Sequence, residues 1–335
     1  MNTTVLIDAL RDGPELTEQF QRSLAALGLD RDFLAARAIF IKPNLTYPLF
    51  KPGVTTRVEY ITALIEALRT LNDSTWIYVG EGESGSRSFA MTEALERMGF
   101  RNIERKFPRV RVVNLSDGPR LRFEAGSCSA AGQIELPRLL CEEIDFAISC
   151  PVPKLHCLTT VSLALKNVWG CLPDAYRLRH HSVLDNVIAQ LAARMRFRYA
   201  FLDGAWGLDG NGPIEGTARR LDWFAASNSL GAFDRVLAAR MGFDASQVAH
   251  LASAERLGLL PALDEIRMIE AARMKPRQFR LRRTFWNYPA LAAFYSRRLT
   301  ELVYLSRFSK AIHRAMYLVR RRAVAPQSVR ELAAE

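Results

Sequence analysis

Short runs of β-branched and other apolar residues alternate with longer amphipathic stretches along the first 150 residues. The longer stretches carry apolar residues at helical spacing. Strands that alternate with helices of this length are typical of βαβ units, and they predict an α/β fold with a largely parallel sheet and helices on both faces. The predicted strands are Thr4–Ile7, Ala38–Ile41, Thr75–Val79, Arg109–Val113 and Ile144–Ser149, and the predicted helices are Glu15–Leu27, Val58–Leu71 and Phe89–Met98.

The alternation continues beyond residue 150 and then gives way to a basic, aromatic-rich segment. We expect an α/β lobe over residues 1–150, a second α/β lobe over residues 151–270 and a basic helical extension over residues 271–335. The glycine-rich segment Asp203–Thr217 is expected to be a long loop. The second lobe is predicted to contain helices His180–Arg198, Leu230–Met241 and Ala245–Arg256 and strands Tyr199–Leu202, Asp222–Ala226 and Glu265–Ile269.

Four of the predicted strands run directly into polar clusters. The carboxyl ends of parallel strands lie at one edge of a sheet, which is where open α/β sheets bind ligands. We therefore expect the clusters to meet in one site. They are Lys42-Pro43-Asn44, the glycine-rich segment 80–85, residues 150–156 and Asp203-Gly204.

The segment around Lys154 and His156 carries the clearest chemistry. Pro151 and Pro153 restrict the backbone there, so a cation and an imidazole are held close together. Such a pair can hold an anion and move a proton. Lys166 ends an apolar run and is suited to act as a base or nucleophile, with a helix-capping lysine as the alternative.

Each candidate residue has a structural alternative, such as a solvated lysine, an acidic loop or a structural histidine. One of the adjacent His180 and His181 is expected to be structural, because neighbours on a helix do not share a face. His156, Glu81 and Asp203 offer ligands for a divalent metal, but no short-range metal motif supports them, and a metal stays open. The predicted catalytic residues are His156, Lys166, His180, His181, Glu81 and Asp203, and the predicted substrate-binding residues are Lys42, Asn44, Lys154, Asn167, Gly204 and Gly212.

The cysteines and the apolar runs indicate the compartment. The chain has five cysteines and no CxxC pair, so neither disulfides nor an iron–sulfur cluster are expected. It also lacks an apolar run long enough for a transmembrane helix, and its first residues do not resemble a signal peptide. We expect a cytoplasmic protein.

Several of these motifs, in this order, resemble the domain-of-unknown-function 362 (DUF362) family over roughly residues 38–245. The resemblance implies an α/β fold and a bacterial or archaeal intracellular protein, and it implies no reaction. Many members carry ferredoxin-like cysteine motifs, which this sequence lacks. The matching segments are Lys42-Pro43-Asn44, Pro153–His156, Ala164–Gly170, His180-His181, Asp203-Gly204, Gly212–Gly216, Phe233–Val236 and Met241-Gly242.

The order of His156, Lys166 and the histidine pair is also similar to the nickel-pincer lactate racemase family. In that family a lysine holds a pyridinium-derived nickel cofactor, and histidines act as ligand and acid–base groups. The glycine-rich stretch that precedes that lysine is replaced here by Ser162-Leu163-Ala164-Leu165. The similarity therefore indicates related architecture and not the same cofactor.

The positive charge of the chain is concentrated near its C-terminus. The net charge is +11, and residues 271–322 contain fourteen Lys and Arg and a single acid, Glu301. Over residues 302–322 a helical wheel separates apolar from basic side chains, which predicts a helix on an anionic membrane surface or, alternatively, one docked on the protein body. Nucleic-acid binding is not expected, because no recognition motif accompanies the charge. The predicted membrane-surface residues are Arg307, Lys310, Arg314 and Arg321.

Two functions follow from these patterns. The first is an enzyme that uses Lys and His groups at the strand ends to act on an anionic small molecule. This molecule would carry a phosphate or carboxylate group, and a lipid-linked molecule is one form of it. The alternative is a non-catalytic scaffold or carrier that docks on the inner membrane through its basic C-terminal helices. The reaction, the substrate and the oligomeric state do not follow from the sequence.

Overall fold

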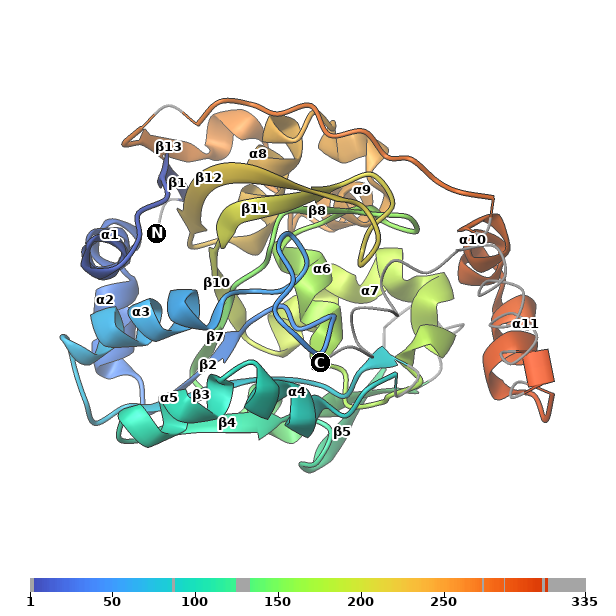
Figure 1. The fold of residues 1–335 in the computed structure, drawn as a ribbon, viewed down its shortest axis with the longest axis horizontal. Coiled ribbons are helices and arrows are strands. Elements are labelled where there is room, and N and C mark those ends of the chain that lie inside the picture. The colour runs from blue at the N-terminus through green and yellow to red at the C-terminus, as the bar shows by residue number, and fades with distance from the viewer. Residues whose placement is uncertain are drawn as a thin grey trace, which may run out of the picture.

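The computed structural model describes residues 3–85, 88–124, 133–272, 274–285, 287–308 and 311–312. The described part contains a mixed, mostly parallel sheet of eleven strands and a separate two-stranded hairpin (Figure 1). The strands are β1 (Thr4–Ala9), β2 (Ala38–Lys42), β3 (Trp76–Glu81), β4 (Val110–Asn114), β5 (Arg120–Glu124), β6 (Gln133–Pro137), β7 (Phe146–Ser149), β8 (Lys154–His156), β9 (Thr160–Ser162), β10 (Phe197–Phe201), β11 (Gly204–Asp209), β12 (Thr217–Ser227) and β13 (Arg267–Glu270).

Helices cover both faces of the sheet, as the alternating pattern predicts. Helices α1 to α5 pack on one face, and helices α6 to α9 pack on the other. The helices are α1 (Pro14–Leu27), α2 (Leu29–Ala35), α3 (Val58–Arg69), α4 (Met91–Arg97), α5 (Phe100–Lys106), α6 (Ala164–Val168), α7 (His181–Arg194), α8 (Leu230–Arg240), α9 (Ala249–Arg256), α10 (Asn287–Tyr295) and α11 (Arg297–Thr300).

The parallel half of the sheet has the order β4–β3–β2–β7–β10. In β2, Ile39 and Ile41 belong to the core beneath α1 to α5, whereas Phe40 belongs to the opposite core. This two-sided burial explains why the strands read as continuous apolar runs. Because all five strands point the same way, the polar clusters that follow β2, β3, β7 and β10 lie along one rim, as the sequence predicts.

The antiparallel half of the sheet contains residues that the sequence analysis assigned to a long loop. Residues 203–217 are not one long loop, because β11 occupies Gly204–Asp209 and pairs with β12, which begins at Thr217. A Cβ on Gly204 would lie 2.4 Å from the Trp223 carbonyl oxygen, so this glycine permits close strand packing and does not mark a flexible loop. Strands from both sides of residue 150 share the sheet, which also contains the short β8 and β9 that the sequence pattern did not predict.

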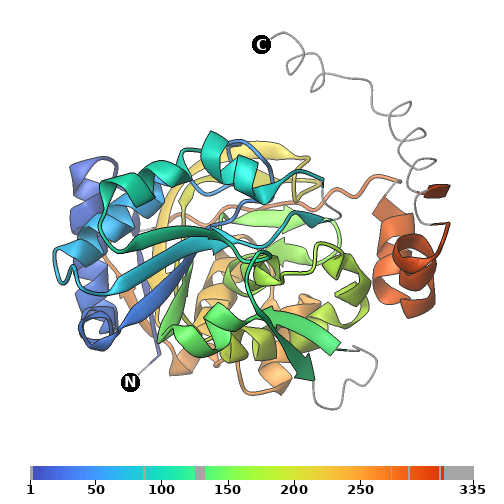
Figure 2. The same ribbon diagram turned by 90° about the horizontal axis from the view of Figure 1, so that it is seen from below.

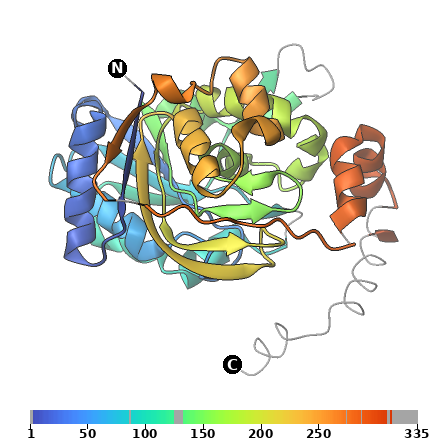
Figure 3. The ribbon, with the colours of Figure 1, turned by 90° about the horizontal axis from the view of Figure 1, so that it is seen from above.

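An extended segment leads from the sheet to the C-terminal helices, and Figure 3 shows it running along the surface of the body. Its backbone donates hydrogen bonds from Phe279 to Met241 and from Arg280 to the Asp209 carboxylate. Helices α10 and α11 then pack beside α7, at one side of the body (Figure 2). Pro289 lies in the first turn of α10.

The predicted helix over residues 302–322 is interrupted within the described residues. A π-helical turn over Glu301–Leu305 ends at Ser306, whose backbone is extended. The Ser306 hydroxyl donates to the Leu302 carbonyl and accepts the Phe308 N–H, a local pattern that competes with helical hydrogen bonds. Arg307 is exposed, and Lys310, Arg314 and Arg321 lie outside the described residues. In the described part of the chain, every helix is too short or too polar to cross a bilayer.

Candidate functional site

A cavity of about 290 Å³ opens at the rim where the polar clusters meet. Segments that follow β2 and β3, together with β8, β9, α6 and the start of α7, supply its walls. The described residues that line it include three basic side chains, Lys154, Lys166 and Arg177, and one carboxylate, Glu81. Its polar and aromatic lining comprises Asn44, Thr46, Glu81, Ser84, Ser88, Phe89, Lys154, His156, Ser162, Lys166, Asn167, Trp169, Arg177 and His181.

Lys42 anchors a buried ionic network beneath the cavity. Its ammonium lies 2.6 Å from the Glu81 carboxylate, 2.6 Å from the Pro43 carbonyl and 3.4 Å from Asn167 Oδ1. Asn167 in turn donates to the Lys42 carbonyl and to the Ser149 hydroxyl. The three protons of Lys42 are thus used inside the protein. The geometry therefore gives Lys42 and Asn167 a positioning role, although the sequence suggested that they contact substrate.

Lys154 forms a second network with neutral acceptors. It donates to Asn44 Oδ1 and the Val54 carbonyl, both at 2.8 Å, and to the Thr46 hydroxyl at 3.2 Å. Burial is the main reason that the pKa of Lys154 is lowered to about 7; the Glu81 carboxylate opposes the shift, and the Lys166 and Lys42 cations add to it. Lys154 therefore holds the segment after β2 against β8 while it adds positive potential to the cavity wall.

Gly170 and Gly82 allow the backbone to close over these networks. A Cβ on Gly170 would lie 1.8 Å from Glu81 Oε1 and 3.1 Å from the Lys42 ammonium. A Cβ on Gly82 would lie 2.6 Å from the Gly170 carbonyl oxygen, which accepts the Gly82 N–H. The glycines in these motifs are explained by close approach to a buried ion pair, and not by a phosphate-binding loop.

Helix α6 is held at its first turn by a carboxylate from α8. Asp234 is fully buried and accepts the N–H groups of Ala164 at 2.7 Å and Leu165 at 3.0 Å. Burial raises the pKa of Asp234 to about 8, although both N–H donors favour the charged form. Because α6 carries Lys166 and Asn167, Asp234 fixes both side chains relative to the sheet.

Lys166 differs from the other two lysines of the site. Its ammonium makes no hydrogen bond or ion pair with any residue that the structure describes, although it lines the cavity. Burial, together with the charge of the nearby Arg177, lowers the pKa of Lys166 to about 8, and Asp185 opposes the shift. The Lys166 amine is therefore not used by the described part of the fold.

Two neutral imidazoles line the same cavity. Burial, reinforced by the charge of Lys166, holds the pKa of His156 and that of His181 well below the usual value. Nδ1 of His156 accepts the Leu158 N–H, so the proton of the neutral ring is on Nε2. The His181 ring lies between Trp169, at 5.9 Å, and Phe294 of α10, at 5.0 Å.

Arg177 was not predicted from the sequence. It lies in the 3₁₀ turn Arg177–His180, lines the cavity and donates to the Glu83 carbonyl. The sequence feature that could have identified Arg177 as a site residue is its position between the Lys166-Asn167 motif and the histidine pair. Its guanidinium suits the recognition of carboxylate or phosphate.

Asp185 and His250 lie behind Lys166 and were also missed. His250 is fully buried, its Nδ1 lies 4.0 Å from the Asp185 carboxylate, and neither ring nitrogen has a hydrogen-bond partner among the described residues. Burial lowers the pKa of His250 to about 3 and raises that of Asp185 to about 6. Asp185 is thus the acidic group that acts on Lys166 from outside the cavity lining.

Besides Lys42, four predicted residues lie outside the cavity lining. Asp203 accepts from the Arg57 backbone and pairs with the Arg57 guanidinium at 2.9 Å, and His180 accepts from Arg179 Nε at 3.2 Å. Gly204 packs against β12, and a Cβ on Gly212 would lie 1.9 Å from the Leu155 carbonyl oxygen. These residues shape the framework around the site.

The suggested metal ligands are not brought together. Asp203 is engaged by Arg57, and Glu81 is engaged by Lys42. Within the described residues, no group of three or more His, Cys, Asp or Glu side chains is arranged to hold a metal ion.

A larger groove of about 610 Å³ lies between α1 and α3. It is lined by residues such as Thr17, Gln21, Thr62 and Glu66, and none of the predicted site residues belongs to it. The smaller cavity at the sheet rim therefore remains the candidate site, because the unpaired Lys166 and the neutral imidazoles lie there.

The chain is similar to several known proteins. A thylakoid-associated protein of Synechocystis sp. is 25% identical over 240 residues, which cover 68% of this chain and 70% of that protein. A crystal structure from Thermotoga maritima is 12% identical with a TM-score of 0.32, and the match covers 60% of this chain and 54% of that one. The family model described as a domain of unknown function (DUF362) matches residues 39–239, which include the lysine motifs of the site. The chain belongs to the DUF362 family.

Proposed function

We propose that the protein is an enzyme whose rim cavity binds a small anionic molecule and transfers protons on it. The observation that carries this proposal is the unpaired Lys166 ammonium in a cavity lined by two further cations. The lone carboxylate of the lining, Glu81, is already neutralised by Lys42. A carboxylate or phosphate would supply the missing counter-charge, and Lys166 and Arg177 are its expected partners.

The imidazoles supply the proton-transfer groups of this proposal. His156 presents an Nε2–H donor, because its Nδ1 is occupied by the Leu158 N–H. His181 is a neutral base on the same cavity wall. General acid–base chemistry requires a proton donor and a proton acceptor beside the bound substrate, and His156 and His181 are the groups proposed for these roles.

Anion titration tests the proposal. Inorganic phosphate and a panel of small carboxylates are titrated calorimetrically against the wild type, Lys166→Met and Arg177→Met, with the exposed Lys275→Met as control. Loss of one charge-assisted hydrogen bond weakens binding by about tenfold or more. Saturable binding that both cavity variants weaken and Lys275→Met preserves supports the proposal. Equal affinities in all four proteins, or no saturable binding to any, contradict it.

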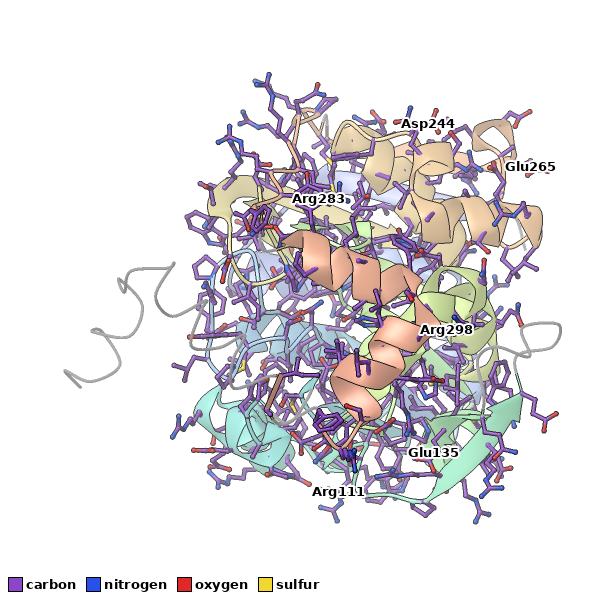
Figure 4. The ribbon with its side chains drawn as sticks, turned by 90° about the vertical axis from the view of Figure 1, so that its right-hand side faces the viewer. Arg111, Glu135, Asp244, Glu265, Arg283 and Arg298 are labelled. Atoms are coloured by element: carbon purple, nitrogen blue, oxygen red, sulfur yellow. The ribbon has the colours of Figure 1, made fainter. Side chains whose placement is uncertain are left out.

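A second candidate, a scaffold or carrier on an anionic membrane surface, is favoured by the C-terminal helices. Tyr288 and Tyr295 lie seven residues apart on one face of α10 and are exposed, as are Leu299 and Leu302 further along. Exposed Arg283 and Arg298 flank them along the same side of the molecule (Figure 4). Aromatic and basic side chains in this arrangement suit a lipid headgroup layer, and a relative is named for its association with thylakoids.

Vesicle sedimentation tests the second candidate. The wild type and a Tyr288→Ser/Tyr295→Ser variant are mixed with phosphatidylcholine vesicles, with or without phosphatidylglycerol, at low salt. Binding to the anionic vesicles that the double variant reduces supports docking through α10. If the wild type ignores anionic vesicles, the membrane role is contradicted and the enzyme proposal is unaffected.

A further inference from the structure

Lys166 is the lysine of the site whose amine is not used by the fold. Lys42 donates to three acceptors and Lys154 also donates to three, whereas Lys166 contacts no hydrogen-bond acceptor in the described part of the chain. We propose that the Lys166 amine forms an imine with the carbonyl carbon of a small anionic aldehyde or ketone. This inference rests on the proposed anion cavity and names the substrate class of that site.

The surroundings of Lys166 favour its neutral, nucleophilic form. Burial and the Arg177 cation lower its pKa to about 8, so about a tenth of the amines are unprotonated at pH 7. An exposed lysine keeps its usual pKa near about 10.4 and carries far less free amine at that pH. A lysine that is partly desolvated beside another cation is the arrangement that activates amines for covalent catalysis.

The reaction balances with the groups that line the cavity. The Nζ lone pair forms a bond to the carbonyl carbon while His156 Nε2–H donates a hydrogen bond to the developing oxyanion. His181 accepts one proton from Nζ and passes it to that oxygen, which gives a carbinolamine. His181 then transfers the second Nζ proton to the departing hydroxyl, which leaves as water when the C=N bond forms. Amine and carbonyl give imine and water, with no oxidant or reductant involved.

Charge and volume define the substrate class. Arg177 remains a cation on the cavity wall after Lys166 becomes neutral, so it favours a carboxylate or phosphate on the carbonyl compound. A cavity of about 290 Å³ lies at the small end of ligand sites. Trp169 adds an indole N–H that is buried without an acceptor among the described residues and lines the same cavity. The site therefore suits a short oxo acid or phosphorylated aldehyde.

Reductive trapping tests this inference on the full chain. The protein is incubated with glyoxylate or pyruvate and cyanoborohydride, and adducts are counted by intact mass and located by peptide mapping. We expect one adduct per chain, at Lys166, that forms at least about tenfold faster than adducts at exposed lysines. Acetaldehyde serves as a probe with the same carbonyl chemistry and no anion, and it should lose this selectivity.

Matched variants separate the covalent step from anion binding. Lys166→Arg keeps the positive charge and should abolish the adduct while phosphate still binds, and Lys275→Arg should change neither. If glyoxylate and pyruvate give no Lys166 adduct in the folded protein, or if adducts follow lysine exposure alone, the inference is overturned. Phosphate binding that persists in that case leaves the proposed function standing, whereas its absence removes both.

Discussion

Lys42 and Lys166 lie in the same site but in opposite electrostatic situations. Lys42 is buried against the Glu81 carboxylate and two neutral oxygens, so its charge is compensated within the fold. Lys166 is partly desolvated without a partner in the described residues, and its pKa falls to about 8. The contrast shows that a lysine motif can serve the framework or the ligand, and that burial together with partner atoms decides which.

The largest expected effect tests whether Lys42 belongs to the framework. Lys42→Met leaves the Glu81 carboxylate buried without its cation, which costs about 3–5 kcal/mol of unfolding free energy. Lys166→Met removes a desolvated cation and should cost nothing at pH 7, because the lowered pKa shows that the fold disfavours this charge. Urea unfolding of both variants measures the difference. Similar losses of unfolding free energy in the two variants would contradict the different roles assigned to Lys42 and Lys166.

An intermediate effect is expected at Gly170, where the framework leaves no room for a side chain. The added methyl of Gly170→Ala would lie 1.8 Å from Glu81 Oε1, so the backbone or the ion pair must shift. Overpacking of this kind costs about 1–3 kcal/mol. Gly118→Ala is the matched control, because a Cβ there meets nothing within 4 Å. Equal unfolding free energies for the two variants would show that the pair is not tightly enclosed.

The smallest effect concerns the titration of Lys166. Anion affinity should be full below pH 8 and should fall as pH rises through about 8, because Lys166 then loses its charge. Asp185 raises the Lys166 pKa, so Asp185→Asn should move this midpoint to lower pH. Calorimetric titration of phosphate between pH 6 and pH 9 measures both, after correction for the ionisation of phosphate itself with Lys166→Met. An unchanged midpoint in Asp185→Asn would show that Asp185 does not affect the pKa of Lys166.

The sequence predicts the rim of the sheet well because local pattern determines it. Buried parallel strands such as β2 and β7 are continuous apolar runs, and their ends are marked by polar residues. The extended state of residues 204–209 was hidden, because glycines at Gly204 and Gly207 resemble loop residues while they serve close packing. Short strands such as β8, which pairs with the neighbouring β9 and at one position with β11, contain too few residues to show a local period.

The sequence predicted most residues of the candidate site, but it did not predict which of them form hydrogen bonds and ion pairs within the fold. Lys42, Lys154 and Lys166 all stand out as cations beside strand ends, and their sequence contexts do not show which protons are already used. Arg177 lies in a short 3₁₀ turn that has no apolar period to mark it. Asp185 reaches the site from helix α7, so its relation to Lys166 exists only once the helices are packed.

The His181 ring connects the C-terminal helices with the cavity. The same ring lines the cavity and contacts Phe294 of α10. A ligand that displaces this ring must also alter the docking of α10, and by reciprocity whatever displaces α10 changes the affinity for that ligand by the same factor. If a ligand displaces the His181 ring, occupancy of the cavity and the position of this aromatic, arginine-rich surface are coupled.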